Sequence, residues 1–230
     1  LAAFVICAAG LMINDFFDFE TDLKKGKKKY SSITKENKQQ LLWFSLVLFV
    51  IGIFLSWLIN ESAFKIAGGI SILLFLYSAV LHEHKYFGNM VVALGTALPL
   101  VFGASVFGNF EVVFWLAGSA FFANWAREIV KDSEDIEADR GHKKTLPMIL
   151  HLSAVDRIVG LLVAIAIVLS YVPIGLAIFG NSYFLVLITI ANVVFIKAFL
   201  EFRNFKTSQS QRTFKWAMLM ALIGFLLGIL

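Results

Sequence analysis

Charged residues are scarce in this sequence of 230 residues, at 16%, whereas hydrophobic residues make up 59%. A soluble domain of this length cannot bury so much apolar surface, so the composition excludes a water-soluble protein and predicts a polytopic membrane protein. Cysteine is almost absent as well. The single Cys7 excludes an intrachain disulfide bond, and its place in an apolar stretch says nothing about the redox compartment.

Signals of nucleic-acid binding and of secretion are also absent. The sequence has neither zinc-ligand spacing nor a basic groove interleaved with aromatic residues, so its net charge of +4 does not indicate a nucleic-acid site. The chain starts at Leu1 inside an apolar run, which leads into acidic residues rather than into a small-residue cleavage site. We therefore expect no cleaved secretory signal here, and we expect an N-terminal segment to precede Leu1.

What is abundant is charge-free sequence, in stretches of the length that a membrane-spanning helix needs. The longest stretch, 158–196, is too long for one crossing and is predicted to divide near Pro173, Gly175 and the turn at 180–182. Pro99 is expected to kink the span that contains it. The predicted class is all-α, a polytopic transmembrane bundle of eight helices. Its spans are 1–14, 41–59, 66–81, 87–110, 112–126, two within 158–196, and 216–230.

Positive charge is distributed unevenly between the two sides of this predicted topology. If the eight helices alternate in direction, Lys65 is the only one of the 20 Lys and Arg residues on its side. By the positive-inside rule the other side is cytoplasmic. Among the acidic residues only Glu61 and Glu111 share the side of Lys65. The remaining acids are therefore expected at the cytoplasmic face of a cell membrane.

Two acidic runs, 14–22 and 132–139, each continue directly from an apolar span. Carboxylates are costly near a bilayer, which makes such clusters candidates for a functional site. At about 100° per residue, helical geometry places one set of side chains from each run on a narrow face. On the first helix these are Asn14, Asp15, Asp18 and Asp22, and on the second, if it continues unbroken, they are Glu128, Lys131, Asp132, Asp135 and Asp139.

Two carboxylate stripes that face each other require cations between them. Hard carboxylate oxygens with an amide favour Mg²⁺ over softer metals, and Mg²⁺ is commonly shared with the phosphates of a substrate. The pattern therefore predicts a diphosphate and Mg²⁺ between the stripes, with Arg127 and Lys131 as further anion ligands. The predicted metal ligands are Asn14, Asp15, Asp18, Asp22, Asp132, Asp135 and Asp139.

The motifs Asn-Asp-x-x-Asp-x-x-x-Asp at 14–22 and Asp-x-x-Asp-x-x-x-Asp at 132–139 resemble those of the UbiA-type intramembrane prenyltransferase superfamily, whose members have nine transmembrane helices. The resemblance covers nearly the whole chain and implies that 1–230 form a single transmembrane domain that lacks the first family helix. Within the superfamily, the sequence is similar to the geranylgeranylglyceryl-phosphate geranylgeranyltransferase branch of ether-lipid synthesis. The segments that carry this similarity are 127–135, 145–147, 77–78 and 88–89.

Two positions depart from the family pattern. The usual Arg-Pro after the first motif is missing, since the lysines of 24–29 lead into 30–32 without a proline. The basic residue that usually follows Tyr77-Ser78 is replaced by His82, or its role passes to Lys85. Both departures concern acceptor binding more than the chemistry.

The resemblance implies Mg²⁺-dependent transfer of a polyprenyl group, geranylgeranyl in this branch, from its diphosphate to the glycerol hydroxyl of geranylgeranylglyceryl phosphate through an allylic cation. It also implies membrane lipids as partners and no nucleic acid. The implied catalytic residues are Asn14, Asp18, Lys131, Asp132 and Asp135, and the implied substrate-binding residues are Tyr77, Lys85, Arg127 and Lys144.

Other interpretations stay open at this point. An aromatic acceptor, such as a quinone or tetrapyrrole precursor, fits the same donor chemistry. A cation transporter would also use intramembrane carboxylates, but it predicts acids near the midplane rather than at helix ends. The acids could be ordinary headgroup-zone carboxylates, and the lysines of 24–38 fit a topology anchor better than a substrate clamp. Tyr77 could belong to an interfacial aromatic belt instead of contacting a diphosphate.

Overall fold

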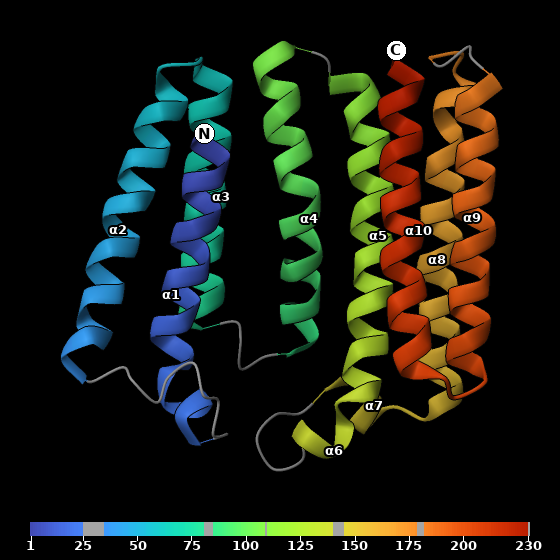
Figure 1. The fold of residues 1–230 in the computed structure, drawn as a ribbon, viewed down its shortest axis with the longest axis horizontal. Helices are drawn as coiled ribbons and strands as arrows, with labels where there is room; N and C mark the ends of the chain where they lie inside the picture. The colour runs from blue at the N-terminus through green and yellow to red at the C-terminus, as the bar shows by residue number, and fades with distance from the viewer. Residues whose placement is uncertain (25–34, 81–84, 109, 140–144, 179–181, 230) are drawn as a thin grey trace. The chain divides into compact units, whose positions relative to one another are not determined.

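The computed structural model describes the chain except for residues 25–34, 81–84, 109, 140–144, 179–181 and 230, which Figure 1 draws as a thin grey trace. Inside the helices, the side chains of 20–24, 35, 36, 85–87, 112, 138, 139, 182 and 229 also lie outside the described part. All regular structure in the described part is helical. The helices are α1 (Ala2–Lys24), α2 (Lys35–Trp57), α3 (Glu61–Ala79), α4 (Lys85–Phe107), α5 (Phe110–Glu134), α6 (Ile136–Asp139), α7 (Leu146–Ile149), α8 (Leu152–Gly175), α9 (Ser182–Arg203) and α10 (Thr207–Ile229).

Eight helices of the described part are long, as predicted, so the all-α polytopic bundle is confirmed. Six of the eight are long and apolar enough to cross a membrane. The other two, α5 and α10, carry charged and polar residues over the last or first three turns, which lowers their mean hydropathy. These helices are those of a multi-pass membrane protein.

The helices extend beyond the predicted spans. α1 continues through the first acidic motif to Lys24, and α5 continues past Ala126 to Glu134. The stretch 158–196 divides as predicted, since α8 ends at Gly175 and α9 begins at Ser182. Hydropathy marks only the part of a helix that lies in hydrocarbon, whereas its backbone hydrogen bonds continue on either side.

The assumption of an unbroken helix through the second motif is wrong. α5 ends at Glu134, and the short α6 begins at Ile136. The backbone N–H of Asp135 still donates to the carbonyl of Lys131 at 3.0 Å, so the helical count holds as far as Asp135 but does not extend to Asp139.

The chain divides into two compact units, and each is described here by itself. Unit 1 comprises residues 1–83 and 102–108, and unit 2 comprises 84–101 and 109–230. The division crosses α4 just after Pro99, which lies inside that helix. The single domain expected for 1–230 stays a prediction.

In unit 1, α1 packs against both α2 and α3. The core between them contains Ile6, Ile13 and Phe49. A Cβ atom added to Gly52 of α2 would meet Cγ1 of Ile6 at 2.5 Å, so glycine is what allows the two helix backbones to approach. This packing holds the part of α1 that precedes the first acidic motif.

In unit 2, α5 packs against α8 and α10, and α9 packs against α8 and α10. Hydroxyl and amide groups join these helices: Ser119 Oγ donates to the carbonyl of Ala166 at 3.0 Å, and Asn192 Nδ2 donates to Ser170 Oγ at 2.9 Å. Association of helices in a bilayer depends on such bonds and on close packing, because lipid is as apolar as the helices. The Ser119 bond thereby joins α5 to α8.

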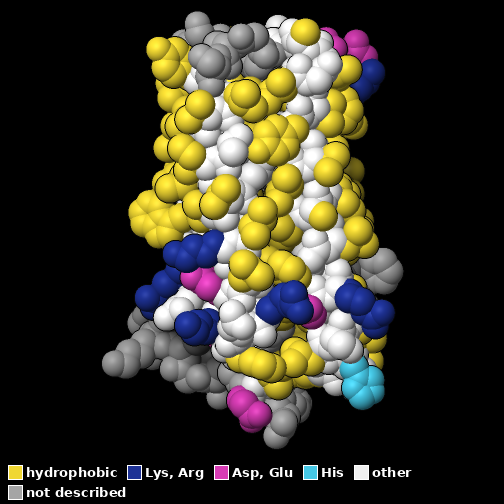
Figure 2. Space-filling view, turned by 90° about the vertical axis from the view of Figure 1, so that its right-hand side faces the viewer, with side chains coloured by type: hydrophobic (Ala, Val, Ile, Leu, Met, Phe, Trp, Pro, Cys, Tyr) yellow, Lys and Arg dark blue, Asp and Glu magenta, His cyan; other side chains and the backbone are white. Residues whose placement is uncertain are grey.

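The charged ends of the helices of unit 2 lie together. Arg203 Nε at the end of α9 lies 3.3 Å from Asp156 Oδ2 near the start of α8, and Gln211 Nε2 of α10 donates to Glu134 Oε2 of α5 at 3.0 Å. Figure 2 shows most of the Lys and Arg side chains of one face at its lower end, below a band of hydrophobic side chains. This uneven distribution agrees with the predicted topology, whereas the cytoplasmic orientation stays a prediction.

Candidate active site

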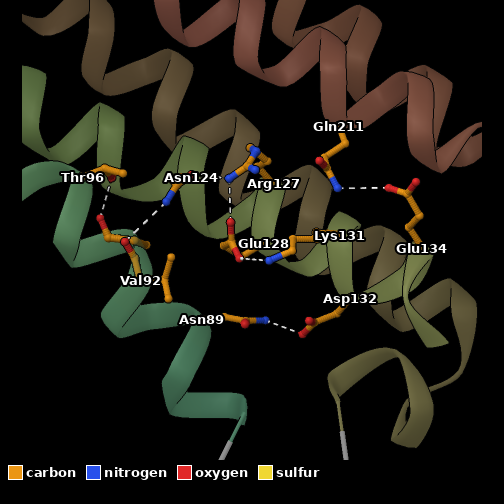
Figure 3. A network of polar contacts seen from close by, with 11 residues as sticks. Asn89, Val92, Thr96, Asn124, Arg127, Glu128, Lys131, Asp132, Glu134 and Gln211 are labelled. Carbon is orange, nitrogen blue, oxygen red and sulfur yellow. Dashed lines mark hydrogen bonds and ion pairs between the residues drawn. The ribbon is translucent and has the colours of Figure 1, made fainter. Parts of the chain in front are cut away.

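The polar stretch of α5 that leads into the second acidic motif is set on a buried helix. Ala126, Ile129 and Val130 are at most 1% exposed and pack in the core of unit 2. Packing fixes the rotation of α5 about its axis. The polar side chains between these buried positions therefore point toward α4 or toward the charged end of the unit. Figure 3 shows the resulting network of polar contacts.

Asp132 is bound by an amide from another helix. Asn89 Nδ2 of α4 donates to Asp132 Oδ2 at 2.7 Å, and the two residues are 7% and 4% exposed (Figure 3). A buried carboxylate is costly unless it is hydrogen-bonded, and bonds to an ionised oxygen are short and strong. The Asn89–Asp132 bond therefore fixes the carboxylate and also joins α4 to α5.

Arg127, Glu128 and Lys131 form a compact group one turn nearer the membrane-spanning part of α5. Arg127 Nη1 lies 2.6 Å from Glu128 Oε1, and Lys131 Nζ lies 3.6 Å from Glu128 Oε2. Arg127 Nη1 also donates to Asn124 Oδ1 at 3.2 Å, and Asn124 Nδ2 donates to the carbonyl of Val92 at 3.5 Å (Figure 3). One carboxylate thus holds two cations beside Asp132.

The first motif lies on α1 in unit 1, where Asn14 and Asp18 are confirmed as neighbours on one face. Asn14 Nδ2 donates to Asp18 Oδ2 at 3.0 Å, the i,i+4 contact that helical geometry predicts. Asp15 and Asp18 are half-buried. Lys38 Nζ of α2 lies 5.2 Å from the ring centroid of Phe16, next to Asp15 in the sequence. The motif therefore combines carboxylate and amide oxygens with a cation nearby.

The remaining predicted site residues are Tyr77 and Asp135, whose side chains the structure describes, and four whose side chains it does not describe. Tyr77 is half-buried on α3, and Asp135 is half-buried directly after α5. Their roles stay predictions. The side chains of Asp22, Lys85, Asp139 and Lys144 lie outside the described part of the structure, and their roles also stay predictions.

The network contains polar residues that were not among the predicted site residues, among them Asn89, Asn124 and Glu128. Asn89 and Asn124 are isolated amides inside the apolar spans 87–110 and 112–126, and a polar side chain within a span was the available signal. Glu128 was placed on the acidic face by its helical phase. Its two cationic partners, Arg127 and Lys131, lie one and three residues away on the same helix, so the spacing along α5 was the available signal.

The oxygen atoms of the two motifs fit a hard divalent cation. They are carboxylate and side-chain amide oxygens, the donors that Mg²⁺ takes in proteins. Within the described residues, no three His, Cys, Asp or Glu side chains converge into a group able to hold a metal by themselves. Mg²⁺ is typically held by one or two carboxylates and completed by phosphate oxygens and water, so the oxygens of each motif, taken by itself, suit a metal that arrives with a phosphorylated substrate.

Known proteins match this chain over nearly its full length. The model of the UbiA prenyltransferase family matches residues 1–223. A digeranylgeranylglyceryl phosphate synthase of Thermococcus kodakarensis is 32% identical over 100% of this chain and 84% of the relative, and one of Methanococcus aeolicus is 33% identical over 100% and 83%. A solved structure from work on digeranylgeranylglyceryl phosphate synthase in membranes has a TM-score of 0.85 and 31% identity, and the match covers 98% of this chain and 82% of that one.

Proposed function

We propose that this chain, which belongs to the UbiA prenyltransferase family, transfers a geranylgeranyl group from its diphosphate to the glycerol hydroxyl of geranylgeranylglyceryl phosphate. The observation that carries the proposal is the full-length similarity to relatives named digeranylgeranylglyceryl phosphate synthase. Membership of a prenyltransferase family also excludes the cation-transporter interpretation. The protein is therefore an enzyme, and its substrates are the subject of the proposal.

The roles proposed for the residues follow from their charges. Mg²⁺, held by oxygens of the two acidic motifs, would neutralise charge on the leaving diphosphate. Asn14 and Asp18 of α1 and Asp132 of α5 supply such oxygens, and Asn89 keeps the Asp132 carboxylate oriented. Asp15, Asp22, Asp135 and Asp139 are proposed to complete this set. Arg127 and Lys131 contribute positive charge to phosphate oxygens, and Tyr77, Lys85 and Lys144 are proposed to contact the substrates.

The reaction proposed is an ionisation followed by attack. The allylic carbon–oxygen bond breaks, the diphosphate leaves with the bonding electrons, and the glycerol oxygen bonds to the allylic cation and releases its proton. The cation must be kept from water until the hydroxyl attacks. The apolar walls of the helices provide this exclusion next to the carboxylates, and we place this charged end of the protein at the cytoplasmic face of the membrane.

A cavity in unit 2 supports a place for the prenyl tail. It has a volume of about 220 Å³ and is lined by α4, α5, α9 and α10, with Thr96, Leu100, Leu116 and Ala120 among its walls. Its two hydroxyl groups are already committed, because Thr96 Oγ1 donates to the carbonyl of Ala93 at 2.6 Å and Ser119 Oγ donates to Ala166 at 3.0 Å. The cavity therefore offers an apolar surface to an apolar ligand.

The position of the cavity matches the length of a geranylgeranyl chain. At a rise of about 1.5 Å per residue, Ala123 lies about 14 Å and Leu116 about 24 Å from Asp132 along α5. An extended isoprene unit adds about 5 Å, given carbon–carbon bonds of about 1.5 Å. The third and fourth units of a diphosphate bound near Asp132 thus reach the depth of the cavity, and the chain ends before Leu116.

Filling this cavity is expected to discriminate between donors by length. Ala120→Leu adds three carbon atoms at about 18 Å from Asp132 along the helix. Because each buried CH₂ contributes about 0.8 kcal/mol, displacement of about two such groups is expected to raise KM for geranylgeranyl diphosphate about tenfold. KM for geranyl diphosphate, which is too short to reach Ala120, is expected to change less than about twofold. Steady-state rates with the two donors measure this difference.

Ala164→Leu is the matched control, because Ala164 is exposed on α8 and the same three carbons face outward there. It is expected to leave both KM values near wild type. Equal losses with both donors in Ala120→Leu would contradict the placement of the tail in this cavity.

The proposed reaction is tested by incubating the complete protein with Mg²⁺, geranylgeranyl diphosphate and one acceptor at a time. The acceptors are geranylgeranylglyceryl phosphate, hydroxybenzoate, dihydroxynaphthoate and chlorophyllide. Product is expected with geranylgeranylglyceryl phosphate alone. Product only with an aromatic compound would overturn the proposed acceptor, and no product with any acceptor or donor length would overturn the proposed reaction.

A further inference from the structure

We infer that the guanidinium of Arg127 binds two oxygens of a substrate phosphate through its Nε–Nη2 edge, and that Asn124 and Glu128 are positioning residues that orient this edge. The inference deepens the proposed function and rests on it for the identity of the substrates. It assigns roles to Asn124 and Glu128, which neither acidic motif contains.

The orientation of Arg127 is determined by its contacts through Nη1. This one nitrogen lies 2.6 Å from Glu128 Oε1 and donates to Asn124 Oδ1 at 3.2 Å (Figure 3). Both partners are buried, since Asn124 is 2% exposed and the side chain of Glu128 is 8% exposed. The protein therefore uses one end of the guanidinium and leaves the opposite edge to other ligands.

Asn124 is itself tied to a neighbouring helix. Its Nδ2 donates to the carbonyl of Val92 in α4 at 3.5 Å, which turns its Oδ1 toward Arg127. A buried side-chain amide has two donors and one acceptor oxygen, so the bond to Val92 decides which end of the amide faces the guanidinium. The position of α4 therefore determines, through Asn124, how the guanidinium of Arg127 is oriented.

The Nε atom of Arg127 is the observation that points to a ligand. It is buried, and no residue of the described part accepts its hydrogen bond. Buried donors are nearly always paired, because an unpaired one loses its bonds to water without replacement. Nε and Nη2 lie side by side on the guanidinium and match the spacing of two oxygens on one phosphate. Arginine can donate to both oxygens at once in this bidentate arrangement, whereas lysine acts as a single point charge.

Glu128 allows two positively charged side chains to lie close together in the site. It lies between Arg127 and Lys131, whose Nζ is 3.6 Å from Glu128 Oε2, and so it separates two cations that would otherwise repel each other. The Arg127 side chain is 17% exposed and that of Lys131 is 45% exposed. Because Arg127 is held in place before substrate arrives, binding costs less side-chain conformational entropy. Lys131 is more accessible to solvent.

Two substrates carry the required chemistry, the diphosphate of the prenyl donor and the phosphate of the acceptor. Three variants test this. Arg127→Lys keeps the positive charge but loses the paired Nε and Nη2 donors, and Asn124→Leu removes the oxygen that accepts from Arg127. Glu128→Gln keeps the shape of the side chain but removes its negative charge. In the complete protein with Mg²⁺, kcat and the KM for each substrate are measured separately. Arg127→Lys is expected to raise one KM about 10- to 100-fold.

Asn124→Leu and Glu128→Gln are expected to raise the same KM about 3- to 10-fold and the other KM less than about twofold. A selective increase for geranylgeranyl diphosphate identifies the donor diphosphate as the ligand, and a selective increase for the acceptor identifies its phosphate. Arg203→Lys is the control, because Arg203 is 56% exposed in a pair with Asp156 elsewhere in unit 2. Equal changes in both KM values, or none, would overturn the inference.

A binding measurement tests the role of Arg127 independently of whether the protein catalyses the proposed reaction. Inorganic pyrophosphate and glycerol phosphate are titrated into the wild-type protein and into Arg127→Lys by calorimetry. Weaker binding of one of them to the variant, about tenfold, supports the inference even if no product is formed by the wild type. Product formation by the wild type together with unchanged binding and unchanged KM values in all three variants would overturn the inference and leave the proposed function standing.

Discussion

Replacement of Asp132 by Asn is expected to lower kcat for prenyl transfer at least about 100-fold, because the variant loses one negatively charged oxygen for the metal and the leaving diphosphate. The fold is expected to survive, since the new side-chain oxygen can still accept the bond that Asn89 donates at 2.7 Å in the wild type. Initial rates measured over a range of Mg²⁺ concentrations test this, and the apparent Mg²⁺ requirement is expected to rise. A rate near that of the wild type would contradict the metal role of Asp132.

Glu134→Gln is the matched control for that experiment. Glu134 lies two residues further along α5, and its carboxylate bonds to Gln211 at 3.0 Å on an exposed part of unit 2. The substitution removes the same charge from the same acidic run. It is expected to leave the rate within about twofold of the wild type, because an exposed carboxylate contributes little beyond its local bond.

Combining Asp18→Asn with Asp132→Asn is expected to be little worse than either change alone. If both helices supply oxygens to one assembly of metal and diphosphate, the first substitution already removes most of what the second could remove. Each single variant is expected to lose at least about 100-fold in kcat, and the double variant less than about tenfold more. The measurement is a double-mutant cycle on kcat at saturating Mg²⁺.

Independent contributions would give a different result, in which the losses multiply to about 10⁴-fold. That outcome would show that the two motifs act separately. Glu61→Gln is the control in unit 1, because Glu61 is exposed and paired with Lys65 at 2.6 Å at the start of α3. Paired with Asp132→Asn, it is expected to add nothing to the loss.

Much of the helical architecture could be predicted, because it follows from the length of apolar runs. The number of long helices agrees with the sequence, and the 158–196 stretch divides where Pro173 and Gly175 indicated. The ends of α1 and α5 could not be predicted in this way. α1 continues through the first motif and α5 stops inside the second, since the balance between helix propensity, packing and repulsion among carboxylates decides where each helix ends.

The site was predictable only in part. Asn14 and Asp18 lie four residues apart on one helix, so helical geometry alone places them in contact, and the structure confirms the bond. Asn89 and Asp132 lie 43 positions apart on different helices. No periodicity within either segment could connect them, because their contact depends on how α4 packs against α5.

By itself, the sequence determined the class of the protein, the number of its long helices, the two carboxylate motifs and their resemblance to prenyltransferases, since these depend on composition and on spacing along one chain. The tertiary structure decided which polar groups meet. It pairs Asn89 of α4 with Asp132 of α5, joins Asn124 of α5 to the carbonyl of Val92 in α4, and leaves Nε of Arg127 buried beside them. The physical reason is that the energy of a buried polar group depends on its partners, and those partners come from other helices.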